Sequence, residues 1–256
     1  MGIAGVRAVL LDLDGTVYEA GRPVAGAAEA VASLRARSIA LRLTSNTDSV
    51  TPAELVARLA AMGIAVAEEE VLTPVVVAAR LFDTTPGCRV LAVASASVRE
   101  RLRHHLSGED EAPTHVLVAD PSYGATYADL DAAFRAVRGG AALVATQAGR
   151  RFLRDDGEHL DTGGWVRMLE YAAEVEARVL GKPNADFVAA ALGTLGVHAD
   201  AAIVVGDDVE SDLGAARAAG ARIALVRTGK GGGDRPEATA ADAVIDSVAD
   251  LAALLR

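Results

Sequence analysis

The chain has 256 residues, of which 51% are hydrophobic and 4% aromatic, and its formal net charge is -10. A chain of this length can bury a full hydrophobic core as one large domain or as two smaller ones. The negative charge argues against nucleic acid as a partner, because binding to phosphate backbones requires clustered Lys and Arg. The sequence also lacks the run of about 18 apolar residues that predicts a membrane span.

The single cysteine, Cys88, rules out an intramolecular disulfide and a Cys-rich zinc site. A reducing compartment therefore fits best. The first apolar run carries aspartates and has no small-residue cleavage site, so it is not a signal peptide. We expect a cytoplasmic protein.

From residue 6 onward, short Val/Leu/Ile runs alternate with longer Ala/Leu/Arg segments of helical period. This alternation is typical of βαβ units around a parallel sheet with right-handed crossovers. The predicted strands lie at 6–11, 39–44, 89–94, 115–118, 141–145, 177–180, 202–205 and 222–226. Helices should fill most of the gaps, and one of them should begin at Thr51-Pro52, where threonine precedes proline. The predicted fold class is α/β with a Rossmann-like parallel sheet.

The first predicted strand ends in Asp12-Leu13-Asp14-Gly15-Thr16. Residues two apart in an extended segment point the same way, so the carboxylates of Asp12 and Asp14 would share one site. The carboxyl end of a buried parallel strand is also where open α/β sheets bind ligands. Taken alone, the motif fits a cation-binding acidic pair and an ordinary Asp-Gly turn equally well.

Two further strand ends carry groups that suit phosphate. Ser45 and Asn46 follow the second strand and offer a hydroxyl and amides, although the same residues are common in turns. Lys182 and Lys230 are the only lysines among 25 basic residues. Lys182 lies at a strand-to-helix junction, where its charge could screen a phosphate and nearby carboxylates or could simply be solvated. The glycine cluster around Lys230 lacks the spacing of a phosphate-binding loop.

The fourth motif is acidic and follows the strand at 202–205. Asp207, Asp208, Glu210 and Asp212 place four acids within six residues. Asp207 should project from the strand end, and Asp212 should lie in the first turn of the next helix, where the helix dipole favours a carboxylate. Such oxygen-rich clusters suit Mg²⁺. A capped helix with an acidic first turn is the alternative.

The four motifs together resemble the haloacid dehalogenase-like hydrolase superfamily. Its motifs are Asp-x-Asp-Gly-Thr, a strand-terminal Ser or Thr, a lysine, and Gly-Asp-Asp-x-x-x-Asp. They stand here as Asp12 to Thr16, Ser45, Lys182, and Gly206 to Asp212, so that the resemblance spans essentially the whole chain.

Spacing indicates an inserted domain. The distance from Asp12 to Ser45 leaves room for one crossover helix, whereas the distance from Ser45 to Lys182 exceeds what the sheet needs. The expected organisation is a catalytic core over 1–77 and 179–256 with an inserted α/β cap of the C2 type over 78–178. In the superfamily, a cap at this position marks subclass IIA, which contains the N-acetylglucosamine-phosphate, phosphoglycolate and pyridoxal-phosphate phosphatases. Three segments look most like the branch containing phospholysine phosphohistidine inorganic pyrophosphate phosphatase: Ser45-Asn46, Gly181-Lys182-Pro183, and Thr162-Gly163-Gly164-Trp165 to Glu170-Tyr171-Ala172.

The resemblance implies a Mg²⁺-dependent phosphatase that hydrolyses a small phosphorylated metabolite through an aspartyl-phosphate intermediate. Asp12 would be the nucleophile and Asp14 the general acid and then base. The carboxylates of Asp12 and Asp207 and the backbone carbonyl of Asp14 would bind Mg²⁺. Phosphate would be held by a set that comprises Ser45, Lys182 and the backbone amides near Leu13 and Asn46.

The remaining implied residues support these or face the substrate. Gly15 would allow the turn under the phosphate, Thr16 would support it, and Asp208 and Asp212 would orient metal-bound waters or Lys182. The candidate substrate loop of the cap comprises Thr162, Gly163, Gly164 and Trp165. Trp165 would line the leaving-group pocket or pack within the cap.

Three alternatives remain after this comparison. A phosphotransferase would share the first half-reaction, and a non-catalytic protein could bind the same metal and phosphate. A haloalkanoic acid dehalogenase is disfavoured because it needs neither Asp14 nor the acidic cluster. The expected partner is a small-molecule phosphate ester, with neither nucleic acid nor membrane, and a homodimer through the cap is expected by resemblance. The sequence does not identify the ester.

Overall fold

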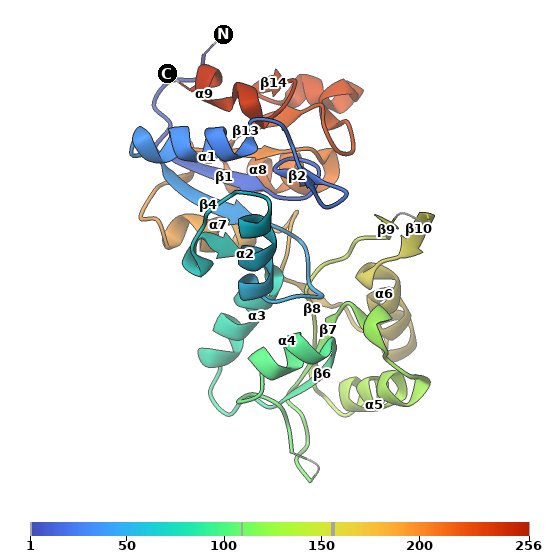
Figure 1. Ribbon diagram of the computed structural model, residues 1–256. Helices are drawn as coiled ribbons and strands as arrows, with labels where there is room; N and C mark the ends of the chain where they lie inside the picture. The colour runs from blue at the N-terminus through green and yellow to red at the C-terminus, as the bar shows by residue number, and fades with distance from the viewer. Residues whose placement is uncertain (1, 109, 155–156, 256) are drawn as a thin grey trace. The chain divides into compact units, whose positions relative to one another are not determined.

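The computed structural model describes residues 2–108, 110–154 and 157–255, and the chain divides into two compact units (Figure 1). The first unit comprises Met1–Ser45, Pro52–Leu72 and Lys182–Arg256. The second comprises Asn46–Thr51 and Thr73–Gly181. Compared with the predicted cap, the second unit also contains 46–51, 73–77 and 179–181. The assignment of the units as core and cap stays a prediction.

The first unit is built on a six-stranded parallel sheet in the order β14-β13-β12-β1-β4-β5. Its strands are β1 (Ala8–Asp12), β4 (Ala40–Thr44), β5 (Val71–Leu72), β12 (Ala202–Gly206), β13 (Arg222–Val226) and β14 (Ala243–Ile245). The central strands β1 and β12 are buried along their whole length. Their nearly continuous aliphatic sequences follow from this, because helices cover both faces of such a sheet.

The helices of the first unit are α1 (Ala27–Ala36), α2 (Pro52–Ala61), α7 (Ala185–Gly193), α8 (Gly214–Ala219) and α9 (Leu251–Leu254). Helix α1 packs with α9, and α7 packs with α8. From β1 the chain crosses through α1 to β4, whereas from β12 it crosses through α8 to β13 in the opposite direction. Right-handed crossovers that run in opposite directions lie on opposite faces of a sheet. The boundary between β1 and β12 is therefore the point where an open α/β sheet binds its ligand.

The second unit contains a four-stranded parallel sheet in the order β11-β8-β7-β6. Its strands are β6 (Val90–Ala94), β7 (His115–Ala119), β8 (Ala142–Ala145) and β11 (Arg178–Val179), and its helices are α3 (Pro74–Asp83), α4 (Ala96–Arg101), α5 (Tyr127–Arg138) and α6 (Thr162–Ala173). Alternate residues of β7 point to opposite faces of this sheet. Leu117 packs with residues of α3 and α4, and Val116 packs with residues of α5 and α6.

The parallel-sheet α/β fold predicted from the sequence is confirmed, and each of the eight predicted strands is present within two residues of its expected bounds. Six strands in the described part of the chain were not predicted. Two of them are the edge strands β5 and β14 of the first unit's sheet. The other four form two antiparallel pairs, β2 (Tyr18–Glu19) with β3 (Arg22–Pro23) and β9 (Arg151–Arg154) with β10 (Gly157–Leu160). None of the helices in the described part of the chain has the length and apolarity that a bilayer crossing requires.

Candidate active site

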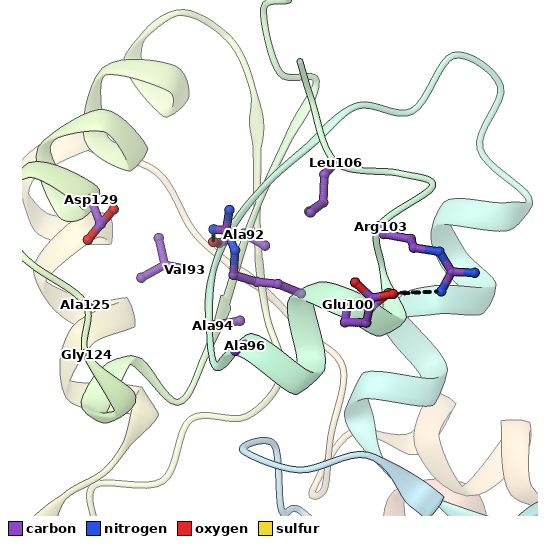
Figure 2. A pocket seen from close by; sticks show the side chains of 11 residues that line it. Ala92, Val93, Ala94, Ala96, Glu100, Arg103, Leu106, Gly124, Ala125 and Asp129 are labelled. Carbon is purple, nitrogen blue, oxygen red and sulfur yellow. Dashed lines mark hydrogen bonds and ion pairs between the residues drawn. The ribbon is translucent and has the colours of Figure 1, made fainter. Parts of the chain in front are cut away.

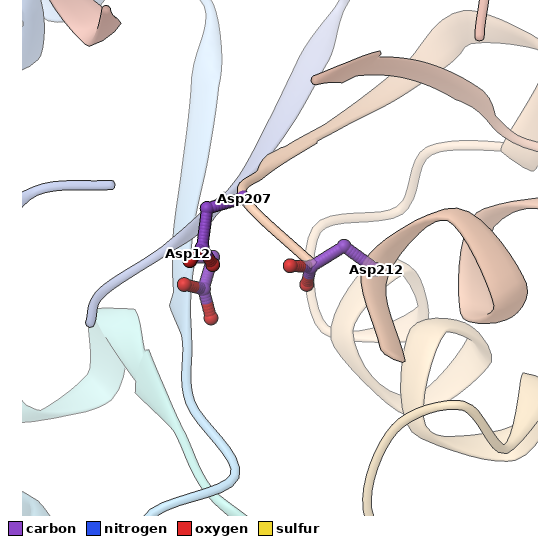
Figure 3. Close-up of side chains that lie close together, drawn as sticks. All are labelled: Asp12, Asp207 and Asp212. Carbon is purple, nitrogen blue, oxygen red and sulfur yellow. The ribbon is translucent and has the colours of Figure 1, made fainter. Parts of the chain in front are cut away.

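Three carboxylates of the first unit gather at the carboxyl end of its sheet (Figure 3). The ligand oxygens of Asp12, Asp207 and Asp212 all lie within 4.8 Å of one another, and the three residues are at most 6% exposed. The register explains the meeting of Asp12 and Asp207: Leu11 of β1 pairs with Val205 of β12, so both chains leave the sheet at the same level. The third carboxylate, from Asp212, comes from the helical turn that follows β12.

Lys182 neutralises part of this acidic cluster. Its Nζ donates to Asp12 Oδ1 at 2.5 Å and to Asp212 Oδ1 at 2.6 Å, and the lysine is only 4% exposed. Burial alone would lower the pKa of Lys182, but the charges of Asp12 and Asp212 outweigh it and raise this pKa above its ordinary value. Lys182 is therefore held as an ammonium between two carboxylates.

A single ammonium leaves the cluster with an excess of negative charge. Burial raises the pKa of Asp12 well above its ordinary value despite Lys182, and it raises the pKa of Asp207 to about 7. Asp212 adds to both shifts by like-charge repulsion. Because a hard divalent cation prefers carboxylate oxygens and would relieve this repulsion, the donor set fits Mg²⁺ or Ca²⁺.

The turn after β12 sets the position of Asp212. Residues Val209–Leu213 form a π-helical turn, whose N-cap Asp208 accepts through Oδ1 from the amides of Glu210 and Ser211. The amide of Asp208 donates to Asp212 Oδ2 at 3.2 Å. A Cβ on Gly206 would overlap the Asp212 carboxylate, so the strand must end in glycine. Asp212 therefore contacts Lys182 directly, whereas Asp208 contacts Lys230 instead.

The turn after β1 is tightly packed beneath Asp207. Gly15 has a φ of +87°, and a Cβ there would overlap the carboxylate of Asp207. Thr16 is buried, and its Oγ1 donates to Asp12 Oδ2 at 3.5 Å. Leu13 is also buried, and its carbonyl accepts from the amides of Thr16 and Val17.

Asp14 differs from Asp12 in its surroundings. Its side chain is exposed, and it is not among the three clustered carboxylates. Desolvation nevertheless raises the pKa of Asp14, while the charge of Lys230 opposes the shift. The pKa of both aspartates in the motif is raised, and Asp14 is the one exposed to solvent.

Sequence reasoning missed the loop of Thr228, Gly229 and Lys230, which supports the cluster after β13. The Thr228 hydroxyl donates to the carbonyl of Gly15 at 2.6 Å. The amide of Lys230 donates to Asp207 Oδ2 at 2.7 Å, and its Nζ donates to Asp208 Oδ2 at 2.5 Å. The rarity of lysine in the sequence could have identified Lys230 as a candidate site residue. It was set aside because the glycines around it lack the spacing of a phosphate-binding loop.

The phosphate-binding residues predicted at the second strand end divide between the units. Ser45 is buried, belongs to the first unit and follows Thr44, which pairs with Asp12 in the sheet. Its amide donates to the carbonyl of Leu72 at 3.1 Å. Asn46 belongs to the second unit. The register thus brings Ser45 to the same sheet edge as Asp12.

The candidate substrate loop at 162–165 is in fact the first turn of helix α6, with Asp161 as its N-cap. Thr162 and Gly163 are buried within the second unit. Trp165 is partly buried and packs against the hydrophobic cluster beneath α5 and α6. The structure therefore supports the packing alternative for Trp165.

A separate pocket of about 470 Å³ lies in the second unit beside the edge strand β6 (Figure 2). Its lining includes Arg99, Glu100, Arg103 and Asp129. Arg99 donates to the carbonyl of Ala92, and Arg103 donates to Glu100. Arg99, Arg103 and Glu100 thus form hydrogen bonds within the second unit. The pocket is lined by none of the predicted catalytic, phosphate-binding or metal-binding residues.

Two family models and the similar curated proteins indicate the same family for this chain. A family model described as haloacid dehalogenase-like hydrolase matches residues 9–105, and a second, described as HAD-hydrolase-like, matches residues 179–251. The phospholysine phosphohistidine inorganic pyrophosphate phosphatase of Rattus norvegicus is 34% identical over 263 residues, which cover 99% of this chain and 95% of that protein.

Solved structures agree with this result. The p-nitrophenyl phosphatase from Archaeoglobus fulgidus superposes with a TM-score of 0.90 at 26% identity, and the match covers 97% of this chain and 98% of that one. The glycerol phosphate phosphatase from Mycobacterium tuberculosis, solved in complex with magnesium, has a TM-score of 0.79 at 29% identity and covers 88% of this chain and 68% of that one.

Proposed function

The chain belongs to the haloacid dehalogenase-like hydrolase family, and on this basis and the geometry of its acidic site we propose that it hydrolyses small phosphate monoesters. The observation that carries the proposal is the buried carboxylate of Asp12, which pairs with Lys182 at 2.5 Å and lies beside Asp207 at the end of the central strands. A nucleophile, a fixed cation and further metal ligands are the groups that phosphoryl transfer requires.

In the first step, Asp12 attacks phosphorus, a bond forms between its carboxylate oxygen and phosphorus, and the bond from phosphorus to the leaving oxygen breaks. Asp14 gives its proton to that oxygen. In the second step, Asp14 takes a proton from water, which attacks phosphorus and releases Asp12. The raised pKa of Asp14 supports this role, because a higher affinity for a proton favours a general acid.

The phosphoryl oxygens would be held by Lys182, by the Ser45 hydroxyl and by the amides near Leu13 and Asn46. Asp12, Asp207 and the carbonyl of Asp14 would hold Mg²⁺, which reduces the repulsion between an anionic nucleophile and an anionic ester. Asp212 is close enough to share this role or to hold Lys182 in place. The second unit is proposed as the cap of the C2 type, and a homodimer through it and a cytoplasmic location remain proposals from the sequence.

The test is a phosphate-release assay over aryl, alkyl, N-phosphorylated and pyrophosphate substrates, with Mg²⁺, with Ca²⁺ and with chelator. The wild-type protein should release phosphate from at least one class with Mg²⁺ and lose this activity with chelator. Asp12→Asn should lose it under all conditions. Asp200→Asn, an exposed aspartate of the same unit, is the matched control and should retain activity.

The same assay separates the alternatives. A phosphotransferase would move phosphate to an added alcohol in preference to water. A non-catalytic protein would bind metal and inorganic phosphate without turnover of any substrate. Activity that survives Asp12→Asn would rule out Asp12 as the nucleophile.

A further inference from the structure

Segment 46–51 runs across the carboxyl ends of the strands in the second unit's own sheet. Ser95, directly after β6, donates to the carbonyl of Ser49 at 2.7 Å. Gly181, two residues after β11, lies against Asn46, whose Oδ1 would be 2.7 Å from a Cβ at that glycine. The ends of β7 and β8 contact Asp48, which lies between these two contacts. The chain's own segment thus occupies the edge where a parallel sheet binds its ligand.

The carboxylate of Asp48 is the centre of this arrangement. Asp48 is 4% exposed, and its Oδ2 accepts from the amide of Asp120 at 3.2 Å and from the Thr146 hydroxyl at 2.5 Å. The same oxygen accepts from the Thr162 hydroxyl at 2.8 Å. Three donors from three separate elements therefore converge on one buried oxygen. Because a buried acceptor without donors is costly, the carboxyl group of Asp48 favours the arrangement in which these three elements meet.

Thr162 connects Asp48 to the beginning of α6. Its hydroxyl also accepts from the amide of Asp120 at 3.2 Å, and its amide donates to Asp161 Oδ1 at 2.8 Å. Asp161 Oδ1 in turn accepts from Gln147 Nε2 at 2.6 Å. The network thus runs from segment 46–51 into the turn that was expected to face the substrate.

We propose that Asp48 is a positioning residue, which fixes segment 46–51 and the first turn of α6 in a single arrangement and thereby sets the affinity for substrate. The substrate part of this proposal rests on the proposed phosphatase function. Asn46, two residues earlier, is a predicted phosphate-binding residue, so displacement of the segment moves a group expected to contact the ester. Burial raises the pKa of Asp48, and the charges of Asp161 and Asp120 add to this shift, while the hydrogen bonds from Thr146 and Thr162 oppose it. These two hydroxyl donors therefore stabilise the ionised form of a group that burial disfavours.

The experiment compares Asp48→Ala, which removes the acceptor, with Asp48→Asn, which keeps an oxygen able to accept from the same donors. Asp110→Ala, an exposed aspartate of the same unit, is the control. Amide hydrogen exchange of the unliganded proteins is the first readout, and KM and kcat for p-nitrophenyl phosphate are the second. Asp48→Ala should speed exchange about tenfold or more at Asp120, Thr162 and segment 46–51 and leave the centres of β7 and β8 unchanged.

KM should rise about tenfold in Asp48→Ala with a much smaller change in kcat, and Asp48→Asn should recover most of both effects. Uniformly faster exchange throughout the second unit would overturn the proposal, because it would show general destabilisation. An unchanged KM would also overturn it. If Asp48→Ala does not fold, Thr162→Val against Thr162→Ser tests the same oxygen with a milder change and the same expected pattern.

The two proposals can fail separately. Absence of turnover in the wild-type protein refutes the phosphatase function, whereas the exchange pattern of Asp48→Ala still decides whether Asp48 holds the segment and the helix start together.

Discussion

Gly15 satisfies two constraints at once, one of backbone conformation and one of space. Its φ of +87° disfavours any side chain, and a Cβ would also overlap the carboxylate of Asp207. Gly5 has a similar φ of +76° but nothing within 4 Å of the position of a Cβ. A comparison of substitutions at Gly5 and Gly15 therefore separates the cost of a left-handed backbone from the effect of overlap with Asp207.

We predict that Gly5→Ala lowers the free energy of unfolding by about 1 kcal/mol, because its backbone is left-handed, and that Gly15→Ala lowers it further, because the overlap with Asp207 adds to the same effect. Only Gly15→Ala should displace Asp207, and it should lower kcat by about 100-fold. Urea unfolding and initial rates of phosphate release measure the two effects. Equal activity of the two variants would show that the position of Asp207 does not depend on Gly15.

Lys182 carries a second prediction at the level of one residue. Lys182→Met leaves Asp12 and Asp212 buried without their shared cation, which should lower the free energy of unfolding by roughly 3 to 5 kcal/mol. Adding Asp212→Asn to this variant should recover part of the loss, because it removes one of the two buried charges. Urea unfolding in the presence of chelator measures both. A single variant as stable as the wild type would contradict the buried ion pairs.

At the level of secondary-structure elements, the loop after β13 supports the turn after β1. Thr228 donates to the carbonyl of Gly15, while the amide of Lys230 donates to Asp207. The turn after β1 packs against the carboxylate of Asp207, and the loop after β13 donates a hydrogen bond to it, although the two segments are distant in the sequence. The support acts through hydrogen bonds to the backbone of Gly15 and to the side chain of Asp207.

Thr228→Val should therefore raise the Mg²⁺ concentration needed for half-maximal activity by about tenfold, since the residues that orient metal ligands typically have effects of this size. Thr228→Ser keeps the hydroxyl and should behave like the wild type. Mg²⁺ titrations of phosphate release compare the three proteins. A normal Mg²⁺ requirement in Thr228→Val would show that the loop does not position Asp207.

Elements were predictable where a local pattern determines them. The strands β1, β4 and β12 are aliphatic runs that are followed by polar residues. Both the strands and the candidate functional residues at their carboxyl ends could therefore be predicted from the sequence. The hairpin of Tyr18–Glu19 with Arg22–Pro23 has two residues in each strand, too few for any periodicity. The strands β9 and β10 are rich in charge and are defined by their pairing with each other.

The candidate site shows the same division. Asp12 and Asp207 could be proposed because each follows a predicted strand of the same sheet. Lys182 could be proposed because it lies at a predicted strand-to-helix junction, although the strand before it, β11, belongs to the sheet of the second unit. Asp48 and Lys230 could not, since their partners become neighbours only through tertiary folding. The contact of Gly15 with Asp207 likewise depends on two separate turns that meet.

For the whole molecule, the buried carboxyl of Asp48 links stability to pH. Burial raises the pKa of Asp48 to about 7, although hydrogen bonds from Thr146 and Thr162 oppose the shift. In the unfolded chain the pKa of the same group is about 3.9. Between these values the folded protein holds a proton that the unfolded chain has released, so stability falls as pH rises through this window.

Asp48→Asn removes this titration and leaves the other ionisable groups in place. We predict that the wild-type protein loses more stability than Asp48→Asn when the pH is raised from 5 to 8. The difference in free energy of unfolding, variant minus wild type, should therefore increase over this range. Urea unfolding of both proteins at the two pH values, with chelator present, measures the difference. Parallel changes in the two proteins would mean that Asp48 is already ionised at pH 5 in the folded state.

The strand order also decides when the acidic cluster can form during synthesis. Ala8 of β1 pairs with Ala202 of β12, whereas the sheet of the second unit is complete once Val179 has been made. A nascent chain can therefore finish its inserted sheet while its central strand β1 still lacks a neighbour on one side. Asp12 meets Asp207 only after the ribosome has passed β12. Partly synthesised chains consequently lack the carboxylate set that could capture a cation or turn over a substrate.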